Sequence, residues 1–282
     1  MIRRLAIVGV GLLGGSVARA ARAHGVAGEI VGIGRDGARL AAALRDGALD
    51  HATTDLPGGV AGADLVILGA TVAANEVLLE KVWAAAGDGA IVTDVGSTKR
   101  SIVRAAERLA ATRPLAFVGS HPMAGSERSG YAASRADLFD GALVVVTPTD
   151  ATEPRAVKGV TAFWEALGAR VTALDPDSHD RGVAAISHLP HLVACALMAA
   201  IARDGADALP LAARGLRDTT RIAASDPAMW AEIFVDNRDA LLARTGEFRR
   251  ALDELERLVR GADRAAIETL LSRIKVAREG LA

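Results

Sequence analysis

The sequence contains a single cysteine, Cys195, and so it has no means of forming an intrachain disulfide. This composition fits a protein of the reducing cytosol, and we therefore expect a cytoplasmic location. Cys195 itself lies in an apolar stretch with helical character. That setting favours a buried structural thiol over a reactive one.

Net charge is also nearly absent, at −1 over 282 residues. Proteins that bind nucleic acid present a strongly basic surface, so no nucleic-acid partner is expected. The first residues lack the apolar stretch and cleavage site of a secretory signal. We also expect no membrane partner, because we expect no apolar run to approach the roughly 20 residues that cross a bilayer.

Hydrophobic residues make up 51% of the chain, enough for one large core or two smaller ones. In the first part of the chain, short apolar runs alternate with helical patterns. This alternation predicts an α/β fold, with a mainly parallel sheet covered by helices on both faces. The expected strands are Leu5–Val10, Glu29–Arg35, Asp64–Thr71, Ala90–Val95, Leu115–Gly119, Ala142–Thr147 and Arg170–Leu174.

The pattern changes after Asp175-Pro176-Asp177, where strand-like alternation ends. Apolar residues then recur at helical spacing, which predicts an all-α segment. We place a dinucleotide-binding domain at 1–176 and a helical substrate and dimerisation domain at 177–282. The apolar stripes are generous for a lone bundle, so we expect a homodimer through the helical domain, although packing within one chain explains the same stripes.

The stretch Gly9-Val10-Gly11-Leu12-Leu13-Gly14 matches the G-x-G-x-x-G fingerprint directly after an expected strand. The first glycine would permit a tight turn, the second the close approach of a pyrophosphate, and the third close helix–strand packing. The phosphates would meet the N-terminus of the following helix. We therefore predict a Rossmann-type doubly wound sheet. The candidate cofactor-binding residues are Gly9, Gly11, Leu12, Gly14, Arg35, Thr71 and Gly96.

The end of the second expected strand bears on the choice of cofactor. NAD-binding sites usually carry an acidic residue here for the ribose hydroxyls, but this chain has Gly34 followed by Arg35. A guanidinium pairs well with a 2′-phosphate, so NADP is favoured and NAD remains possible. Asp36 would serve the ribose if the register were shifted, and Arg35 would then be a solvated surface residue.

Two residues are candidates for catalysis. His121 follows the strand expected at Leu115–Gly119 and lies among small residues. Ser97 follows the strand expected at Ala90–Val95. Ligands of doubly wound sheets bind beyond the carboxyl ends of strands, so both side chains would face the cofactor cleft. Ser97 could instead cap the next helix.

The helical part adds further candidates. His188 and His191 are three residues apart, but Pro190 disturbs a shared helix face and no zinc-type spacing appears, so no metal site is expected. Arg221 is a candidate carboxylate clamp, with an interhelical salt bridge as the alternative. Trp230 follows shortly after, and core or interface packing is its default interpretation.

Taken together, these segments resemble the prephenate/arogenate (cyclohexadienyl) dehydrogenase family of tyrosine biosynthesis. The resemblance implies a Rossmann domain, a helical dimerisation domain and an active site between them. It also implies oxidative decarboxylation of a cyclohexadienol by NAD(P)+. The matching segments, which span nearly the whole chain in family order, are GVGLLGGS at 9–16, DVGSTK at 94–99, GSHPMAGSE at 119–127, SHLPH at 187–191 and DTTRIAASDPAMW at 218–230.

The resemblance also implies roles for single residues. His121 matches the catalytic histidine, Ser97 the catalytic serine, and Arg221 the arginine that binds the substrate carboxylate. Residues implied around the substrate pocket are His179, His191, Glu127 and Trp230. Neither a chorismate mutase domain nor a regulatory ACT domain is expected.

Two other functions are compatible with parts of the sequence. A β-hydroxyacid-type NAD(P) dehydrogenase shares the architecture but needs a catalytic lysine in the helical domain, where Lys275 is the single lysine. A non-enzymatic NADP-sensing protein would keep the glycines but would not need His121, Ser97 and Arg221 together.

Overall fold

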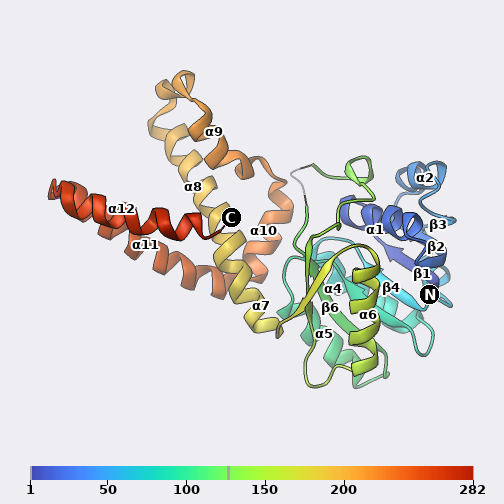
Figure 1. Cartoon of the computed structure of the whole chain (residues 1–282). Coiled ribbons are helices and arrows are strands. Elements are labelled where there is room, and N and C mark those ends of the chain that lie inside the picture. The colour runs from blue at the N-terminus through green and yellow to red at the C-terminus, as the bar shows by residue number, and fades with distance from the viewer. Residues whose placement is uncertain (1, 126–127, 282) are drawn as a thin grey trace. The chain divides into compact units, whose positions relative to one another are not determined.

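A computed structural model describes residues 2–125 and 128–281 of the chain (Figure 1). Its described residues form two compact units, 1–238 and 239–282. The first unit holds an eight-stranded sheet with strand order β3-β2-β1-β4-β5-β6-β7-β8. The strands are β1 (Ile2–Val8), β2 (Ala27–Ile33), β3 (His51–Thr53), β4 (Leu65–Leu68), β5 (Ile91–Asp94), β6 (Ala116–Pro122), β7 (Leu143–Thr147) and β8 (Arg170–Ala173).

The predicted mainly parallel sheet is confirmed, because β6 and β7 form the single antiparallel pair among the described strands. Two short elements escaped prediction, the edge strand β3 and the helix α3 (Leu56–Val60). Three residues are too few to show an alternating pattern, and the sequence of α3 contains a proline and two glycines, which are poor helix formers.

Helices cover both faces of the sheet, as expected for a doubly wound fold. Along β1, Leu5 and Ile7 join the core under α1 (Leu12–Ala23) and α6 (Pro154–Ala166). The alternating residues Ala6 and Val8 join the core under α4 (Val72–Ala85) and α5 (Arg100–Ala110). Successive side chains of a strand point to opposite faces, so one apolar strand supplies both cores. Helix α2 (Gly37–Arg45) follows β2.

All regular structure after β8 in the described residues is helical. A continuous helix runs through α7 (Pro176–Val183), a π-helical turn (Ala184–His188) and α8 (Leu189–Asp204). The wide turn directly precedes Pro190, whose ring clashes with the carbonyl of an ordinary α-helical turn. The remaining helices are α9 (Arg214–Thr220), α10 (Pro227–Asp236), α11 (Arg238–Arg260) and α12 (Arg264–Glu279), the last two coloured red in Figure 1.

The expectation about long apolar runs is wrong for this continuous helix. Between Pro176 and Arg203 it contains an 18-residue window of mean hydropathy 1.7, of which 22% is buried within the protein. By length and composition this one helix could cross a membrane. The sequence did not predict this run because His188, Pro190 and His191 interrupt its apolar residues. One such helix is weak support for a membrane protein, since a helix packed against a protein partner has the same composition.

Hydrogen bonds tie the first helices after the sheet to the sheet unit, so the compact units divide after residue 238 rather than after 176. The Ser101 hydroxyl donates to Asp236 of α10 at 2.9 Å. The backbone N–H of Ala73 donates to Glu232 at 3.1 Å. The boundary proposed from the sequence marks the end of the strands, and a folding unit of 177–282 stays a prediction.

Candidate active site

The carboxyl ends of four neighbouring strands meet at one edge of the sheet. Backbone bonds continue the parallel ladder just past the strands, from Gly9 to Ile33 at 2.8 Å, from Gly69 to Val8 at 2.7 Å and from Val95 to Leu68 at 3.1 Å. In open α/β sheets this edge is where ligands bind. The candidate residues of the first unit that follow β1, β4 and β5 therefore share one edge.

The glycine fingerprint has the shape of a cradle for a dinucleotide. Gly9 has φ +100°, a conformation that favours glycine, and a side chain there would also strike the backbone of Gly69. At Gly14 a Cβ would lie 2.0 Å from the Gly9 carbonyl oxygen, so helix α1 approaches the turn too closely for any side chain at this position. At Gly11, by contrast, a Cβ would meet nothing within 4 Å.

These three positions fit a bound pyrophosphate. Gly9 and Gly14 let the turn and helix pack, and Gly11, the N-cap of α1, leaves open space in front of the helix N-terminus. Backbone N–H groups and the helix dipole favour an anion at such a place. Leu12 is the first residue of α1, while Thr71 is the exposed N-cap of α4 and Gly96 is buried beyond β5.

Around the adenosine end of the expected cofactor, Arg35 is exposed and Gly34 is half-buried. Asp36 caps helix α2 by accepting from the Ala38 N–H at 2.9 Å, and it lies 3.6 Å from the Arg39 guanidinium. Its carboxylate therefore already has partners in α2. This makes Asp36 a weaker candidate for the ribose than the sequence suggested.

His121 lies within β6, near its carboxyl end, rather than after the strand. The strand is longer than predicted because it changes partner: Ala116–Val118 pair with β5 in parallel, and Gly119–Pro122 pair with β7 in antiparallel. His121 is opposite Val145 in that second register. Pairing with β7 at this position holds the backbone of the candidate base in place.

The half-buried His121 ring is the first member of a chain of polar groups that runs into the protein interior. Its Nδ1 lies 2.9 Å from Nε2 of His179, and Nδ1 of His179 lies 2.7 Å from the Asp180 carboxylate. His179 and Asp180 are each only 1% exposed. Both ring nitrogens of His179 are therefore engaged, and it stands behind His121 rather than open to the pocket where the sequence placed it.

Asp180 is bound by the N-terminus of α5. It accepts the backbone N–H of Lys99 at 2.8 Å and that of Arg100 at 3.0 Å. Burial raises the pKa of this carboxyl, but hydrogen bonds from His179, Arg100 and Lys99 outweigh it and leave the pKa below its usual value. Asp180 is therefore ionised at neutral pH.

Burial lowers the pKa of His121 well below its ordinary value, and the electrostatic influence of its neighbours His179, Lys99 and His188 lowers it further. Desolvation disfavours the charged form of an imidazole, and like charges do the same. His121 is consequently neutral at physiological pH. If His121 acts as a base, its acid limb is therefore expected below the usual histidine range.

A buried ion pair lies beneath this edge. The Lys99 ammonium pairs with the Asp94 carboxylate at the end of β5 and also donates to the Ser120 carbonyl at 3.0 Å. Neither side chain is more than 1% exposed. Lys99 is also the N-cap residue of α5, so Ser97, two residues earlier and half-buried, does not cap that helix.

An aromatic cluster forms on the helical side. His191 stacks on Trp230 with ring centroids 3.5 Å apart and an interplanar angle of 10°. His188 meets the edge of the same tryptophan and also contacts Asn237, whose amide lies 3.1 Å from His188 Nδ1. Burial lowers the pKa of His188 to about 4 and also lowers that of His191.

Two polar atoms of this cluster, His191 Nδ1 and Trp230 Nε1, are buried and have no hydrogen-bond partner in the described part of the chain. Arg221 is exposed at the start of a short 3₁₀ helix, Arg221–Ala224, and Glu127 lies outside the described residues. In the described ranges no group of three or more His, Cys, Asp or Glu side chains is arranged to hold a metal ion.

From the sequence, no catalytic or binding role was predicted for Asp180, Lys99 or Asp94. Asp180 is 81 residues from Lys99, and no spacing rule links the two. Lys99 and Asp94 do belong to the DVGSTK segment, but charged residues are usually exposed, so nothing in the sequence indicated that these two pair in the interior.

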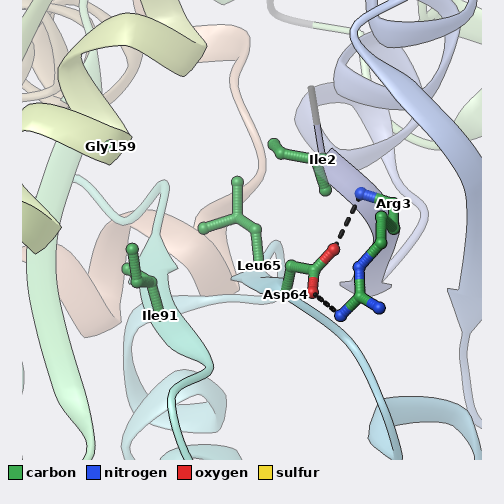
Figure 2. A pocket seen from close by; sticks show the side chains of 6 residues that line it. All are labelled: Ile2, Arg3, Asp64, Leu65, Ile91 and Gly159. Carbon is green, nitrogen blue, oxygen red and sulfur yellow. Dashed lines mark hydrogen bonds and ion pairs between the residues drawn. The ribbon is translucent and has the colours of Figure 1, made fainter.

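A pocket of about 320 Å³ lies elsewhere, at the amino ends of β1, β4 and β5 (Figure 2). It is lined by Ile2, Arg3, Asp64, Leu65, Ile91 and Gly159. Its one ionic contact in Figure 2 joins Arg3 to Asp64, and Asp64 also accepts the backbone N–H of Arg3 at 2.7 Å. This opposite edge of the sheet is not where doubly wound folds bind their cofactors.

Comparison with known proteins gives the family. Residues 17–173 match the family model for the prephenate dehydrogenase nucleotide-binding domain, and residues 175–275 match the prephenate dehydrogenase dimerization domain. Prephenate dehydrogenase of Bacillus subtilis is 35% identical over 280 residues, which are 98% of this chain and 75% of that protein.

Solved structures agree along the full length. Prephenate dehydrogenase from A. aeolicus, crystallised in complex with hydroxyphenyl propionate and NAD+, superposes with a TM-score of 0.93 at 33% identity, covering 100% of this chain and 99% of that one. Synechocystis arogenate dehydrogenase gives a TM-score of 0.85 at 31% identity, covering 99% and 100%. The chain therefore belongs to the prephenate dehydrogenase family.

Proposed function

We propose that this protein catalyses the oxidative decarboxylation of prephenate or arogenate in tyrosine biosynthesis, with a nicotinamide dinucleotide as hydride acceptor. The observation that carries the proposal is a neutral histidine, His121, at the ligand-binding edge of the sheet and hydrogen-bonded to a second histidine. Membership of the family and the glycine cradle at 9–14 support it.

His121 has the properties of a general base for this reaction. A neutral imidazole accepts the proton of the substrate's ring hydroxyl, and a positioned base of this kind contributes typically 10²–10⁴-fold to rate. Ser97, half-buried beyond β5, would orient that hydroxyl. When bound, the oxidised nicotinamide supplies the hydride acceptor for the same ring carbon. The carbonyl formed there draws electrons from the bond to the ring carboxylate, so carbon dioxide leaves and the ring becomes aromatic.

The helical side supplies candidate substrate contacts. The orphan polar atoms His191 Nδ1 and Trp230 Nε1 would be satisfied by a bound ligand, since a buried polar atom without a partner costs about 1–3 kcal/mol. Arg221 and Glu127 are proposed on sequence grounds, Arg221 as the partner of a substrate carboxylate. These contacts would orient the substrate from its ends, so that its ring is positioned for the reaction.

Incubation of the protein with prephenate or arogenate and with NAD+ or NADP+, followed by absorbance of the reduced nicotinamide, tests the proposal. At least one of the four combinations should give reduced cofactor and carbon dioxide in equal amounts. A panel of β-hydroxy acids should give none, because Lys275, the one lysine after Lys158, pairs at 3.6 Å with Glu279 along α12. Turnover of those acids alone would contradict the proposal.

Cofactor choice is a separate proposal, which rests on the exposed Arg35 and the missing acidic residue at Gly34. We expect NADP+ to be preferred. The change Arg35→Ala should weaken NADP+ binding by about 1.5–3 kcal/mol, the range for hydrogen bonds to charged groups, and should leave NAD+ binding nearly unchanged. Isothermal titration with both cofactors measures this, with Arg45→Ala, exposed at the end of α2, as the control. A wild-type preference for NAD+ would contradict it.

We also expect the protein to be a homodimer formed mainly by the helical region. Support comes from the dimerization-domain match and from the exposed apolar residues of α11 and α12, among them Leu242, Val259 and Val276, each at least 60% exposed. Apolar area of this kind is usually covered by a partner. Light scattering should give twice the chain mass of 29.0 kDa at micromolar concentration. A mass of one chain would refute the dimer.

A further inference from the structure

The chain of hydrogen bonds behind His121 determines which of its nitrogens can act as the base. The Asp180 carboxylate accepts two backbone N–H groups, from Lys99 and Arg100, and these groups can only donate. Because Asp180 is an acceptor, Nδ1 of His179 must carry the proton that it shares with Asp180, 2.7 Å away.

A neutral His179 with its proton on Nδ1 has a lone pair on Nε2. That atom faces Nδ1 of His121 at 2.9 Å, so Nδ1 of His121 must be the donor. The Nε2 atom of His121 is then left with a lone pair. The Asp180 carboxylate thus sets the tautomer of His179, and His179 in turn sets that of His121.

We propose that His179 and Asp180 are positioning residues that hold His121 as the Nδ1–H tautomer and share the proton it accepts. The inference rests on the proposed function for the identity of the proton donor. When the ring hydroxyl gives its proton to Nε2 of His121, the Nδ1 proton passes to Nε2 of His179. The positive charge then lies beside the Asp180 carboxylate instead of on His121.

The proton balance of the reaction requires such temporary storage. The ring hydroxyl loses a proton as the carbonyl forms, the hydride leaves with the cofactor, and carbon dioxide leaves its bonding electron pair in the ring. The same oxygen then becomes a phenolate that takes a proton back. No proton is lost overall, so His121 and His179 together must accept one proton and later return it.

Storage on His121 alone would be unfavourable, because desolvation and the nearby Lys99 ammonium depress its pKa. Asn237 supports the arrangement from the helical side, since its amide donates to the Asp180 backbone carbonyl at 2.7 Å. His121 comes from β6, and His179 and Asp180 come from α7. The hydrogen-bonded chain therefore depends on the docking of α7 against the N-terminus of α5.

Nitrogen NMR of the full-length protein labelled with ¹⁵N-histidine tests the tautomer without any turnover. The His121 signals are assigned by their loss in His121→Asn. In the wild type at neutral pH, Nδ1 of His121 should be protonated and Nε2 unprotonated. In His179→Phe the Nε2–H tautomer should replace it, and kcat should fall by about 10²-fold with KM unchanged.

A second variant separates this role from mere packing. In His179→Gln the side-chain carbonyl can accept from His121 and the amide can donate to Asp180, so the Nδ1–H tautomer should be retained. Its kcat should lie between those of the wild type and His179→Phe, because an amide positions the base but takes up no proton. His51→Phe, at an exposed histidine, should change neither measurement.

The proposal is overturned if His121 in the wild type carries its proton on Nε2, if His179 is an imidazolium at neutral pH, or if His179→Phe leaves the tautomer unchanged. A wild type with the expected tautomer but no activity on prephenate or arogenate would instead overturn the proposed function. The two failures therefore give different results.

Discussion

Replacement of His121 by asparagine is expected to lower kcat by about 10²–10⁴-fold, the usual span for a positioned acid–base group. Asparagine keeps polarity and some hydrogen bonding but cannot accept the proton. Affinity for the dinucleotide should be unchanged, because the glycine cradle at the start of α1 is separate from β6. Stopped-flow turnover and cofactor titration measure the two quantities.

Arg221→Ala is the matched contrast to this variant. Arg221 is proposed to bind the substrate carboxylate, so its loss should raise KM for the substrate and leave the pH profile in place. If His121→Asn kept near-normal turnover, or lost only cofactor affinity, the proton would have to leave through Ser97 and water, and His121 would not be the base.

The pH profile of the wild type follows from the pKa of His121. The base must be neutral, and its pKa is held well below 6.5 by burial and by the electrostatic influence of His179, Lys99 and His188. Values of kcat/KM should therefore stay on their plateau as pH falls through 6.5 and decline only at lower pH, where His121 becomes protonated. A half-maximum at or above 6.5 would contradict this assignment.

The second large effect is expected from Lys99→Met, which keeps the length of the side chain and removes its charge. The buried Asp94 carboxylate would then lose its ionic partner. Loss of one partner of a buried pair costs about 3–5 kcal/mol, because the remaining charge is uncompensated. This is a large part of the roughly 5–15 kcal/mol that stabilises a typical domain.

Urea unfolding followed by circular dichroism measures the loss. Lys158→Met, at an exposed position of α6, is the matched control and should change stability by less than about 0.5 kcal/mol. Asp94→Asn combined with Lys99→Met should recover part of the loss, since no unpaired charge remains. A single Lys99→Met variant as stable as the control would mean that water or another group compensates Asp94.

Much of the dinucleotide-binding part was accessible from the sequence because its signals are local. The fully buried strand β4 is a continuous apolar run, and the spacing of the glycines at 9, 11 and 14 predicts the tight turn and the close packing of the helix. The edge strand β3 and the short helix α3 were missed because three or five residues carry too little pattern. The apolar window between Pro176 and Arg203 was not predicted because two histidines and a proline interrupt the apolar residues.

The site was accessible only in part. His121 and Ser97 stood out because each follows an apolar strand, where ligands bind. His179 was picked out as a residue of the pocket, whereas the structure buries it behind His121 with both nitrogens engaged. The fixed registers of β6, first with β5 and then with β7, also placed His121 inside the strand rather than beyond it.

By itself, then, the sequence determined the doubly wound sheet, the dinucleotide cradle and the identity of the candidate base. Each of these depends on residues within one turn or strand of each other. The tertiary structure alone decided which groups act on that base. Asp180 meets Lys99 across 81 residues only because α7 docks on the N-terminus of α5, and desolvation of the half-buried His121 ring lowers its pKa. Burial and long-range hydrogen bonding arise from packing, which local patterns do not encode.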